Sequence, residues 1–274
     1  MSQLHVAHSP CPNDTFIYHA WTHGLVDGPA TRVTFADIDV TNTACQRGEF
    51  DVAKVSFAAL PYLGDQWRLL PAGGALGRGC GPLVVTKSLR ERGDLQGARV
   101  AVPSERSTAY LLYRLWAEGV NPSAVEVVPF ADIMPGVAEG RFDAGLVIHE
   151  ARFTYQGLGL ECLVDLGRWW EDTMDAPIPL GAIVAKRSLE AEPLVEAIRS
   201  SLEYAWKHPE SSADYVRQHA QEMSPEVCQA HIDLYVNEFS LDLGSTGRLA
   251  VHTLLSRAEE LGLVPAGPRW WEET

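Results

Sequence analysis

The sequence predicts an α/β protein in which short buried strands alternate with helices, and three observations support this prediction. Short apolar runs such as residues 144–148 are better suited to buried strands than to helices, and they end at polar residues. The phrase Gly-x-Phe-Asp precedes such a run twice, at Gly48 and at Gly140, which indicates two similar half-structures rather than a solenoid of short repeats. From Pro193 onward the periodicity is helical, which predicts a helical C-terminal segment.

The length and charge of the chain exclude several classes of protein. A chain of 274 residues fits one large or two medium α/β domains. The formal net charge of -14, without a run of Lys and Arg, argues against a surface for nucleic acid or for an anionic membrane. No stretch reaches the roughly eighteen apolar residues of a membrane span. Residues 1–5 lead directly into a strand without the features of a secretion signal, so we expect a cytoplasmic protein.

The five cysteines predict neither a disulfide framework nor a zinc site. Their number is odd, their spacing is wide and they contain no Cys-x-x-Cys pair. We expect most of them to be small buried apolar residues. They are Cys11, Cys45, Cys80, Cys162 and Cys228.

The first strand, residues 4–7, leads into a loop that contains Ser9, Asn13 and Asp14, and a helix follows over residues 16–21. Such a strand, loop and helix present backbone N–H groups and hydroxyls at the carboxyl end of a strand, which suits a carboxylate or phosphate ligand. The alternative is that Asn13 and Asp14 only cap the helix.

Residues 33–40 alternate like a second strand, and residues 41–47 have the pattern of a short helix. The first Gly-x-Phe-Asp phrase then leads into an apolar run that ends at Ser56, and residues 57–63 predict another short helix. Residues 73–81 contain five glycines but lack the Gly-Lys-Ser/Thr of a Walker A loop. Glycine at this density indicates a hinge or a close approach of backbones.

Two similar strands, residues 82–89 and 180–189, bracket a self-contained α/β pattern. The economical interpretation is one domain inserted into another, with these strands as paired crossovers that form a hinge. The sequence therefore predicts a large discontinuous α/β domain formed by residues 1–86 and 187–274, and a small inserted α/β domain formed by residues 87–186.

The inserted domain begins with a strand, and Ser107 or Thr108 is well placed to cap the helix that follows. The first N–H groups of that helix, at Thr108 and Ala109, would bind an anion or belong to an ordinary cap. A strand, a helix and the second Gly-x-Phe-Asp phrase follow. The last apolar run ends next to His149, and the carboxyl ends of strands face the ligand crevice of an open α/β sheet. We therefore expect a site built around His149, with Ser56 facing it across a shared cleft.

The C-terminal part predicts helices over residues 194–207, 211–219, 225–239 and 246–261, with a clear start signal at Ser224. His231 lies on the same helix face as Val227 and Leu234. This position favours a core histidine with satisfied hydrogen bonds over a ligand-binding residue.

Six motifs together resemble the 1,4-dihydroxy-6-naphthoate synthases of the futalosine route to menaquinone. The resemblance spans essentially the whole chain and implies a two-lobed fold similar to the type II periplasmic binding proteins, with a ligand cleft between the lobes and a helical C-terminal segment. The motifs are Ser9-Pro10-Cys11-Pro12-Asn13-Asp14-Thr15-Phe16, Lys54-Val55-Ser56, the loop 73–82, Ser107-Thr108-Ala109-Tyr110, Ile148-His149-Glu150-Ala151-Arg152-Phe153-Thr154-Tyr155 and Tyr235-Val236-Asn237.

The resemblance implies a carbon-carbon lyase that cleaves a small-molecule carboxylate, cyclic dehypoxanthine futalosine, to 1,4-dihydroxy-6-naphthoate. By the same resemblance, residues 54–56 (Lys54, Val55 and Ser56) and Thr108 with Ala109 match the family's substrate-binding stretches, and His149 matches its proton acceptor. No metal or organic cofactor is implied, and the sequence makes no prediction of oligomeric state.

The implied chemistry agrees with the residue types. An imidazole with an ordinary pKa near 6.5 is mostly neutral in the cytosol and can accept a proton, while formation of an aromatic naphthalene drives cleavage. Two other functions are considered. A solute-binding protein would share the two-lobed fold but would need a secretion signal or a lipid anchor. A chorismate dehydratase of the same superfamily is the nearer rival, and only the resemblance around His149 argues against it.

Overall fold

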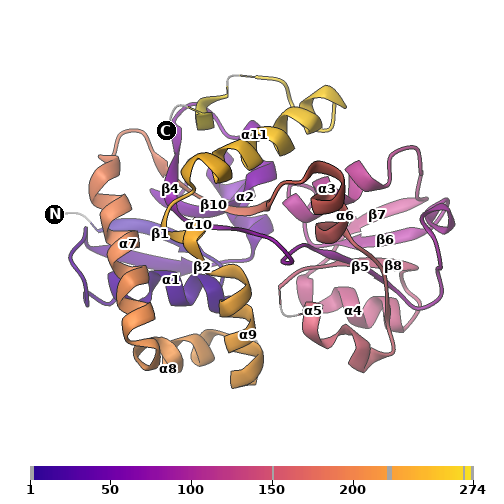
Figure 1. The fold of residues 1–274 in the computed structure, drawn as a ribbon, viewed down its shortest axis with the longest axis horizontal. Helices are drawn as coiled ribbons and strands as arrows, with labels where there is room; N and C mark the ends of the chain where they lie inside the picture. The colour runs from indigo at the N-terminus through magenta and orange to yellow at the C-terminus, as the bar shows by residue number, and fades with distance from the viewer. Residues whose placement is uncertain (1–2, 150, 221–223, 268, 273–274) are drawn as a thin grey trace. The chain divides into compact units, whose positions relative to one another are not determined.

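The computed structural model describes residues 3–149, 151–220, 224–267 and 269–272, and the chain divides into two compact units (Figure 1). Unit 1 consists of residues 1–77 and 179–274, and unit 2 of residues 78–178. The sequence predicts these boundaries at 86/87 and 186/187. They lie earlier in the structure because the strand over residues 83–86 belongs to the sheet of unit 2, while the chain returns to unit 1 at the start of the strand over residues 178–186.

The sheet of unit 1 has five strands in the order β2-β1-β3-β10-β4. Strand β1 runs parallel to both β2 and β3, and β10 runs antiparallel to β3. The parallel strands follow from the strand-loop-helix pattern of the first fifty residues, because a helix must cross over between parallel neighbours. The strands are β1 (Leu4–His8), β2 (Thr31–Phe35), β3 (Val52–Ser56), β4 (Trp67–Gly77) and β10 (Ile178–Lys186).

Helices cover both faces of this sheet, and strand residues therefore alternate between two apolar cores. Val52 packs into one core and its neighbour Ala53 into the other. The first core includes residues of α1 (Pro12–Thr22), α7 (Ala191–Lys207), α8 (Pro209–His219) and α9 (Pro225–Tyr235). The second includes residues of α2 (Ile38–Gln46), η1 (Phe57–Tyr62) and α11 (Gly244–Glu260). Figure 1 shows α1 and α7 side by side, and they pack closely.

Strand β4 ends the sheet, and the segment around α10 (Glu238–Leu241) covers its outer edge. Ser240 Oγ donates to the carbonyl oxygen of Gly74 at 2.8 Å, and Asn237 Nδ2 donates to that of Leu76 at 2.9 Å. The predicted helix over residues 225–239 consequently ends at Tyr235, because Asn237 caps α10. Side chains thus satisfy edge carbonyls that would otherwise be open to pairing with another chain.

Unit 2 contains a second five-stranded sheet in the order β7-β6-β8-β5-β9. Strand β6 runs parallel to β7 and β8, and β5 runs antiparallel to β8 and β9. The two halves thus repeat a pattern of parallel strands joined by helices, as the repeated phrase predicts. The strands are β5 (Leu83–Thr86), β6 (Arg99–Val102), β7 (Ala124–Val127), β8 (Ala144–Val147) and β9 (Glu161–Asp165).

The helices of unit 2 pack tightly on its sheet. Gly145 of β8 shows how close the contact is, since a Cβ there would lie 2.7 Å from a methyl carbon of Ile133. Ile133 belongs to α4, which contributes to an apolar core on this face. The helical segments are η2 (Arg92–Leu95), α3 (Thr108–Trp116), α4 (Phe130–Ala138), α5 (Ala151–Thr154), η3 (Tyr155–Leu158) and α6 (Leu166–Met174).

The structure contradicts part of one local prediction, the strand over residues 33–40, and agrees with another, the close packing at the glycine-rich stretch. The strand predicted over residues 33–40 was wrong in its second half, because Asp37 adopts an extended conformation and α2 begins directly after it. The glycine-rich stretch does serve close approach: a Cβ at Gly73 would lie 2.1 Å from the terminal methyl of Ile183, and one at Gly81 would lie 2.2 Å from Gly167 Cα. A hinge at this stretch stays a prediction.

The cysteines behave as small apolar residues, as predicted. Cys45, Cys80 and Cys228 are buried, Cys11 is partly exposed, Cys162 is exposed, and none of the five forms a disulfide. Burial raises the pKa of Cys45 and of Cys80 to about 12, so these two thiols are protonated and unreactive at neutral pH.

Candidate active site

A buried ion pair lies in unit 1 where β1 passes into α1. Asp14 belongs to the first turn of α1, and Lys54 lies on the adjacent strand β3. Lys54 Nζ lies 3.1 Å from Asp14 Oδ1, and the two side chains are only 3% and 4% exposed. Two charges this deeply buried need further partners to offset their lost hydration, and such pairs are common at functional sites.

Hydrogen bonds complete this pair. Ser9 Oγ donates to Asp14 Oδ2 at 2.8 Å, Asn13 Nδ2 donates to Oδ1 at 3.0 Å, and Lys54 Nζ donates to the carbonyl oxygen of Gly73 at 2.7 Å. Burial acts to raise the pKa of Asp14, but the charge of Lys54 and the hydrogen bonds from Ser9 and Lys54 together lower it below its ordinary value. Asp14 is therefore ionised at neutral pH.

The simple capping alternative for the first loop does not describe these side chains. Cys11 occupies the N-cap of α1, and no side-chain hydrogen bond caps this helix. Ser9, Asn13 and Asp14 instead turn into the buried cluster around Lys54.

His231 joins this cluster from α9. It is completely buried, as predicted, and its Nε2 lies 2.9 Å from Asn13 Oδ1. Because the amide nitrogen of Asn13 donates to Asp14, its oxygen must accept, so His231 Nε2 carries the proton. The sequence pattern correctly places His231 in the core but misses its hydrogen bond to the candidate site.

His8, the last residue of β1, adds a neutral imidazole to the same region. It is fully buried and stacked on Tyr18, with ring centroids 4.4 Å apart. Its Nδ1 lies 2.8 Å from the carbonyl oxygen of Ser9, so Nδ1 carries the proton and Nε2 is an acceptor. Burial lowers the pKa of His8, and within the described chain its Nε2 has no hydrogen-bond partner.

The neighbouring strand leaves room for Lys54. A Cβ at Gly181 of β10 would lie 2.8 Å from Lys54 Cε. Only glycine leaves enough space at this position for the lysine side chain to reach both Asp14 and the Gly73 carbonyl.

Ser56 ends β3 and is fixed by a residue that the sequence analysis does not single out. Its N–H donates to Asn42 Oδ1 at 2.8 Å, and Asn42 Nδ2 donates to Ser56 Oγ at 3.1 Å. Asn42 is fully buried on α2. An asparagine within a helical pattern does not by itself indicate a functional role in the sequence. Val55 points into the opposite apolar core, so its backbone rather than its side chain is available to a ligand.

In unit 2, Thr108 and Ala109 form the first turn of α3. Ser107 is the N-cap, since its Oγ accepts a hydrogen bond from the N–H of Tyr110 at 3.1 Å. Thr108 and Ala109 are each 2% exposed. Their N–H groups lie at the N-terminus of the helix, where the helix dipole favours a negative charge.

His149 lies two residues beyond β8 in a strained backbone conformation. Its φ of 54° is in the left-handed region, which histidine adopts more readily than branched residues but still at a cost. The side chain is half-buried, and the ring of Phe130 packs edge-on at 5.8 Å between centroids. The carbonyl oxygen of His149 accepts from the N–H of Arg152 at 3.3 Å, which connects this turn to α5.

The first turn of α3 and His149 both follow the carboxyl ends of neighbouring strands in unit 2. Strands β6 and β8 are parallel neighbours, with Val100 opposite Ala144, and α3 follows β6 just as His149 follows β8. A helix N-terminus that favours anions and an imidazole that can accept a proton therefore lie on the same side of this sheet, at the carboxyl ends of its parallel strands. This arrangement suits a reaction in which a carboxylate is held and a proton is removed.

Two classes of site find no support in the described part of the chain. Among those residues no group of three or more His, Cys, Asp and Glu side chains is arranged to hold a metal ion. None of the helices described there is both long and apolar enough to cross a membrane.

Solved structures show that the architecture is a known one. The chain resembles protein AF1704 from Archaeoglobus fulgidus with a TM-score of 0.88, at 33% identity over 96% of this chain and 98% of that one. A Candida albicans protein described as having the generic periplasmic binding protein fold aligns with a TM-score of 0.71 at 12% identity, over 98% and 93% of the two chains. The alkanesulfonate-binding protein SsuA of Xanthomonas axonopodis, solved with MOPS, gives 0.72 at 14% identity over 97% and 95%. The predicted two-lobed fold class is thus confirmed.

Sequence relatives point to one pathway. A protein named 1,4-dihydroxy-6-naphtoate synthase from Streptomyces coelicolor is 59% identical over 97% of this chain and 96% of its own length. A protein of the same name from Thermus thermophilus is 46% identical over 98% of both chains. A family model described as menaquinone biosynthesis matches residues 4–260. The chain therefore belongs to the menaquinone biosynthesis family, as its motifs predict.

Proposed function

We propose that this protein is a cytoplasmic 1,4-dihydroxy-6-naphthoate synthase, a carbon-carbon lyase that converts cyclic dehypoxanthine futalosine without a metal or organic cofactor. Membership of the menaquinone biosynthesis family and the name of two near full-length relatives support this proposal. The observation in the structure that supports it best is the strained backbone of His149. This residue follows the carboxyl end of β8, the strand that runs beside β6, and β6 leads into α3.

His149 is the general base in this proposal. A residue held in the left-handed region costs about 1–3 kcal/mol, and such strain concentrates at positions where function requires one orientation. The imidazole removes a proton from the sugar-derived part of the substrate, and aromatisation of the product makes the carbon-carbon cleavage favourable. Phe130 packs against the ring edge-on and limits its rotation.

The substrate carboxylate is bound by N–H groups and hydroxyls. Thr108 and Ala109 provide a helix N-terminus next to the proposed base in unit 2. Lys54, Val55 and Ser56 also contact the substrate, with Val55 acting through its backbone. Ser56 is held in place for this role by its two hydrogen bonds with Asn42.

The remaining first-loop residues have a related role in the proposal. Ser9, Asn13 and Asp14 were predicted as ligand contacts, and Ser9 and Asn13 both donate to Asp14. Asp14 itself is paired with Lys54. These three residues therefore hold Lys54 in one orientation as well as offering polar atoms to the substrate.

The test of the proposal is turnover of the His149→Asn variant. Asparagine keeps a hydrogen-bond donor but cannot accept a proton with the same affinity, so turnover of cyclic dehypoxanthine futalosine should fall about a hundredfold to ten-thousandfold. Binding of 1,4-dihydroxy-6-naphthoate, measured by calorimetry, should persist. His208→Asn is the matched control, since His208 has a 51% exposed side chain and lies in the other unit.

Products should be analysed by mass spectrometry, with chorismate supplied in a parallel reaction. Conversion of chorismate but not of the futalosine derivative would identify a dehydratase. Binding without conversion of either compound would identify a solute-binding protein. If the His149→Asn variant folds normally and keeps most of its turnover, His149 is not the base.

A further inference from the structure

The turn that contains His149 leads into a helix that is too short to be stable by itself. Helix α5 spans only the four residues Ala151–Thr154, and two of them are exposed. One helical turn is unfavourable in isolation, because its backbone must be fixed for very few hydrogen bonds. His149 nevertheless has a left-handed φ of 54°, a conformation that persists only where the surrounding structure imposes it. Contacts with other segments of unit 2 are therefore needed to hold this turn.

Arg152, the second residue of α5, makes such contacts. Its Nη2 donates to Asp165 Oδ2 at 2.9 Å, and its Nη1 donates to the carbonyl oxygen of Gly81. Its backbone N–H donates to the carbonyl oxygen of His149 at 3.3 Å. One residue thus connects the turn of His149 with the end of β9 and with the segment that enters β5. A planar guanidinium that donates to two anchors in different directions has little freedom to rotate.

Both anchors of Arg152 are themselves held in place. Asp165 is the N-cap of α6, and its Oδ1 accepts hydrogen bonds from the N–H groups of Gly167 at 2.9 Å and Arg168 at 3.1 Å. Gly81 packs directly on the same helix, because a Cβ at Gly167 would lie 2.6 Å from Gly81 Cα. The guanidinium therefore binds to a closely packed part of unit 2 and not to a free loop.

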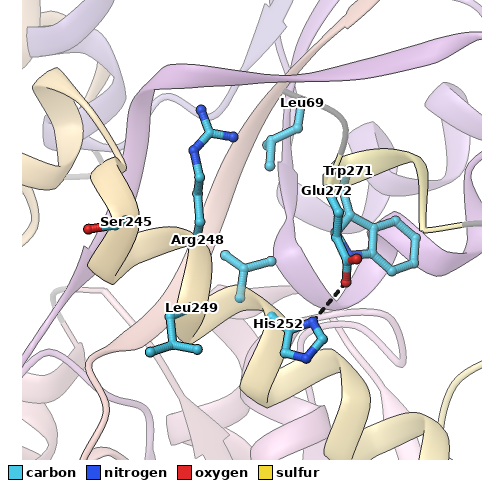
Figure 2. Close-up of a pocket in the computed structure, with 8 residues that line it drawn as sticks. Leu69, Ser245, Arg248, Leu249, His252, Trp271 and Glu272 are labelled. Atoms are coloured by element: carbon cyan, nitrogen blue, oxygen red, sulfur yellow. Dashed lines mark hydrogen bonds and ion pairs between the residues drawn. The ribbon is translucent and has the colours of Figure 1, made fainter.

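Burial distinguishes the Arg152–Asp165 pair from an ordinary pair at the surface. The side chains of Arg152 and Asp165 are 15% and 26% exposed. Figure 2 shows a contact of the other kind in unit 1, where His252 Nδ1 lies 2.8 Å from Glu272 Oε1 but the two side chains are 48% and 41% exposed. Exposed pairs are screened by water and salt and contribute little, whereas a pair shielded from water is screened much less. The Arg152 pair is thus the better suited of the two to fix a geometry.

We propose that Arg152 is a positioning residue that holds the turn of His149, and so keeps the imidazole on the side of the sheet where α3 begins. The proposal rests on the proposed function, in which His149 is the base. Arg152 acts through the backbone of the turn and not through contact with the substrate. Without its guanidinium the turn can relax out of the left-handed region, and the imidazole then leaves its edge-on contact with Phe130. A displacement of about 1 Å costs on the order of a hundredfold in rate.

The experiment compares the kinetics of three variants with the parent. Arg152→Gln keeps one hydrogen-bond donor but loses the charge and the two-point contact, so kcat should fall about tenfold to a hundredfold while KM changes less than about threefold. Arg152→Lys keeps the charge without the fork and should lose less. Asp165→Asn weakens the same contact from the other side and should lower kcat in the same direction. Arg152→Gln combined with Asp165→Asn should cost less than the product of the two single effects.

Two further variants test whether Arg152 acts through His149. In the double variant Arg152→Gln/His149→Asn, turnover should fall little below that of His149→Asn, because the residue that Arg152 positions has already been removed. The matched control is Arg141→Gln. Arg141 also pairs with a carboxylate of unit 2, Glu139 at 3.0 Å, but both side chains are more than half exposed, and kcat should be unchanged. The limb of the pH profile near the histidine pKa should persist in Arg152→Gln at a lower plateau.

Nuclear magnetic resonance of histidine-labelled protein gives a measurement that does not depend on turnover. The chain has nine histidines, and the signal of His149 is the one that is missing from His149→Asn. This signal should shift or broaden in Arg152→Gln and stay in place in Arg141→Gln. If His149→Asn keeps its turnover, the proposed base is wrong, but the position of the His149 signal still decides whether Arg152 holds the turn.

Two results would overturn the proposal. The first is an unchanged His149 signal with a parent-like kcat in folded Arg152→Gln. The second is a loss of turnover on adding Arg152→Gln to His149→Asn that is as large as the loss in the parent, since Arg152 would then act on something other than His149. If Arg152→Gln does not fold, Arg152→Lys and Asp165→Asn are used for the same measurements with the same criteria.

Discussion

Replacing Lys54 by methionine should destabilise unit 1 by about 3–5 kcal/mol, the cost of leaving one member of a buried ion pair without its partner. Asp14 would keep the hydrogen bonds from Ser9 and Asn13 but lose the ammonium at 3.1 Å. Methionine has nearly the same length as lysine, so little packing is lost and the effect is mainly electrostatic. The Gly73 carbonyl would lose its donor as well.

The assay must report on unit 1 alone, because a single unfolding free energy is poorly defined for a chain with two units. Hydrogen exchange of peptides from β1 and β3, followed by mass spectrometry, provides such a measurement. The Asp14→Asn variant should cost a similar amount. The double variant should cost less than the sum of the two by at least about 2 kcal/mol, since it removes both charges together.

The dependence of stability on pH gives a second test of the same ion pair. The pKa of Asp14 lies below its ordinary value of 3.8, so its contribution to stability is complete above that value and is lost as the pH falls through the folded-state pKa. Asp14→Asn should lack this loss. A Lys54→Met variant that costs less than about 1 kcal/mol, or strictly additive effects in the cycle, would refute the view that the pair is held by charge in a poorly hydrated interior.

Three other predictions follow from the same unit. Gly181→Ala would place a methyl group 2.8 Å from Lys54 Cε, and protein stability should fall by about 1–3 kcal/mol, with unchanged stability arguing against close packing here. His231→Leu removes the donor to Asn13 and should cost about 1–3 kcal/mol, whereas His231→Gln should recover part of it; equal losses would exclude a hydrogen-bond role. Burial lowers the pKa of His19 to about 4, so folded stability should fall by up to about 3 kcal/mol as the pH drops from 6.5 to 4, and His19→Gln should reduce this fall in a thermal-melting series.

The parts of the fold that the sequence predicts are those set by local pattern. Ser56 and His149 follow short apolar runs, and the structure places Ser56 at the end of β3 and His149 two residues past β8. The glycine at position 73 was predicted to allow close packing, and a Cβ there would collide with the side chain of Ile183. Hydrophobic periodicity and turn residues depend only on residues close together in the sequence. They can therefore be recognised without knowing the tertiary contacts.

The parts that the sequence does not predict depend on contacts between distant residues. His231 bonds with Asn13 across 218 positions, and no local pattern can signal such a pair. Asn42 has no chemical motif around it, although it fixes Ser56. The positions where the chain passes between units differ from the prediction for the same reason, since strand pairing decides to which sheet residues 83–86 belong.

The two candidate sites place charge in different ways, and this difference separates their expected roles. In unit 1, Asp14 and Lys54 are paired, buried and hydrogen-bonded, and the pKa of Asp14 lies below its ordinary value. Such a fixed cluster is better suited to orienting a ligand than to transferring protons. In unit 2, His149 is only half-buried, and its backbone lies in the left-handed region just past the end of β8. If the proposed roles hold, substitutions in unit 1 should affect stability and substrate binding before they affect the rate of proton transfer.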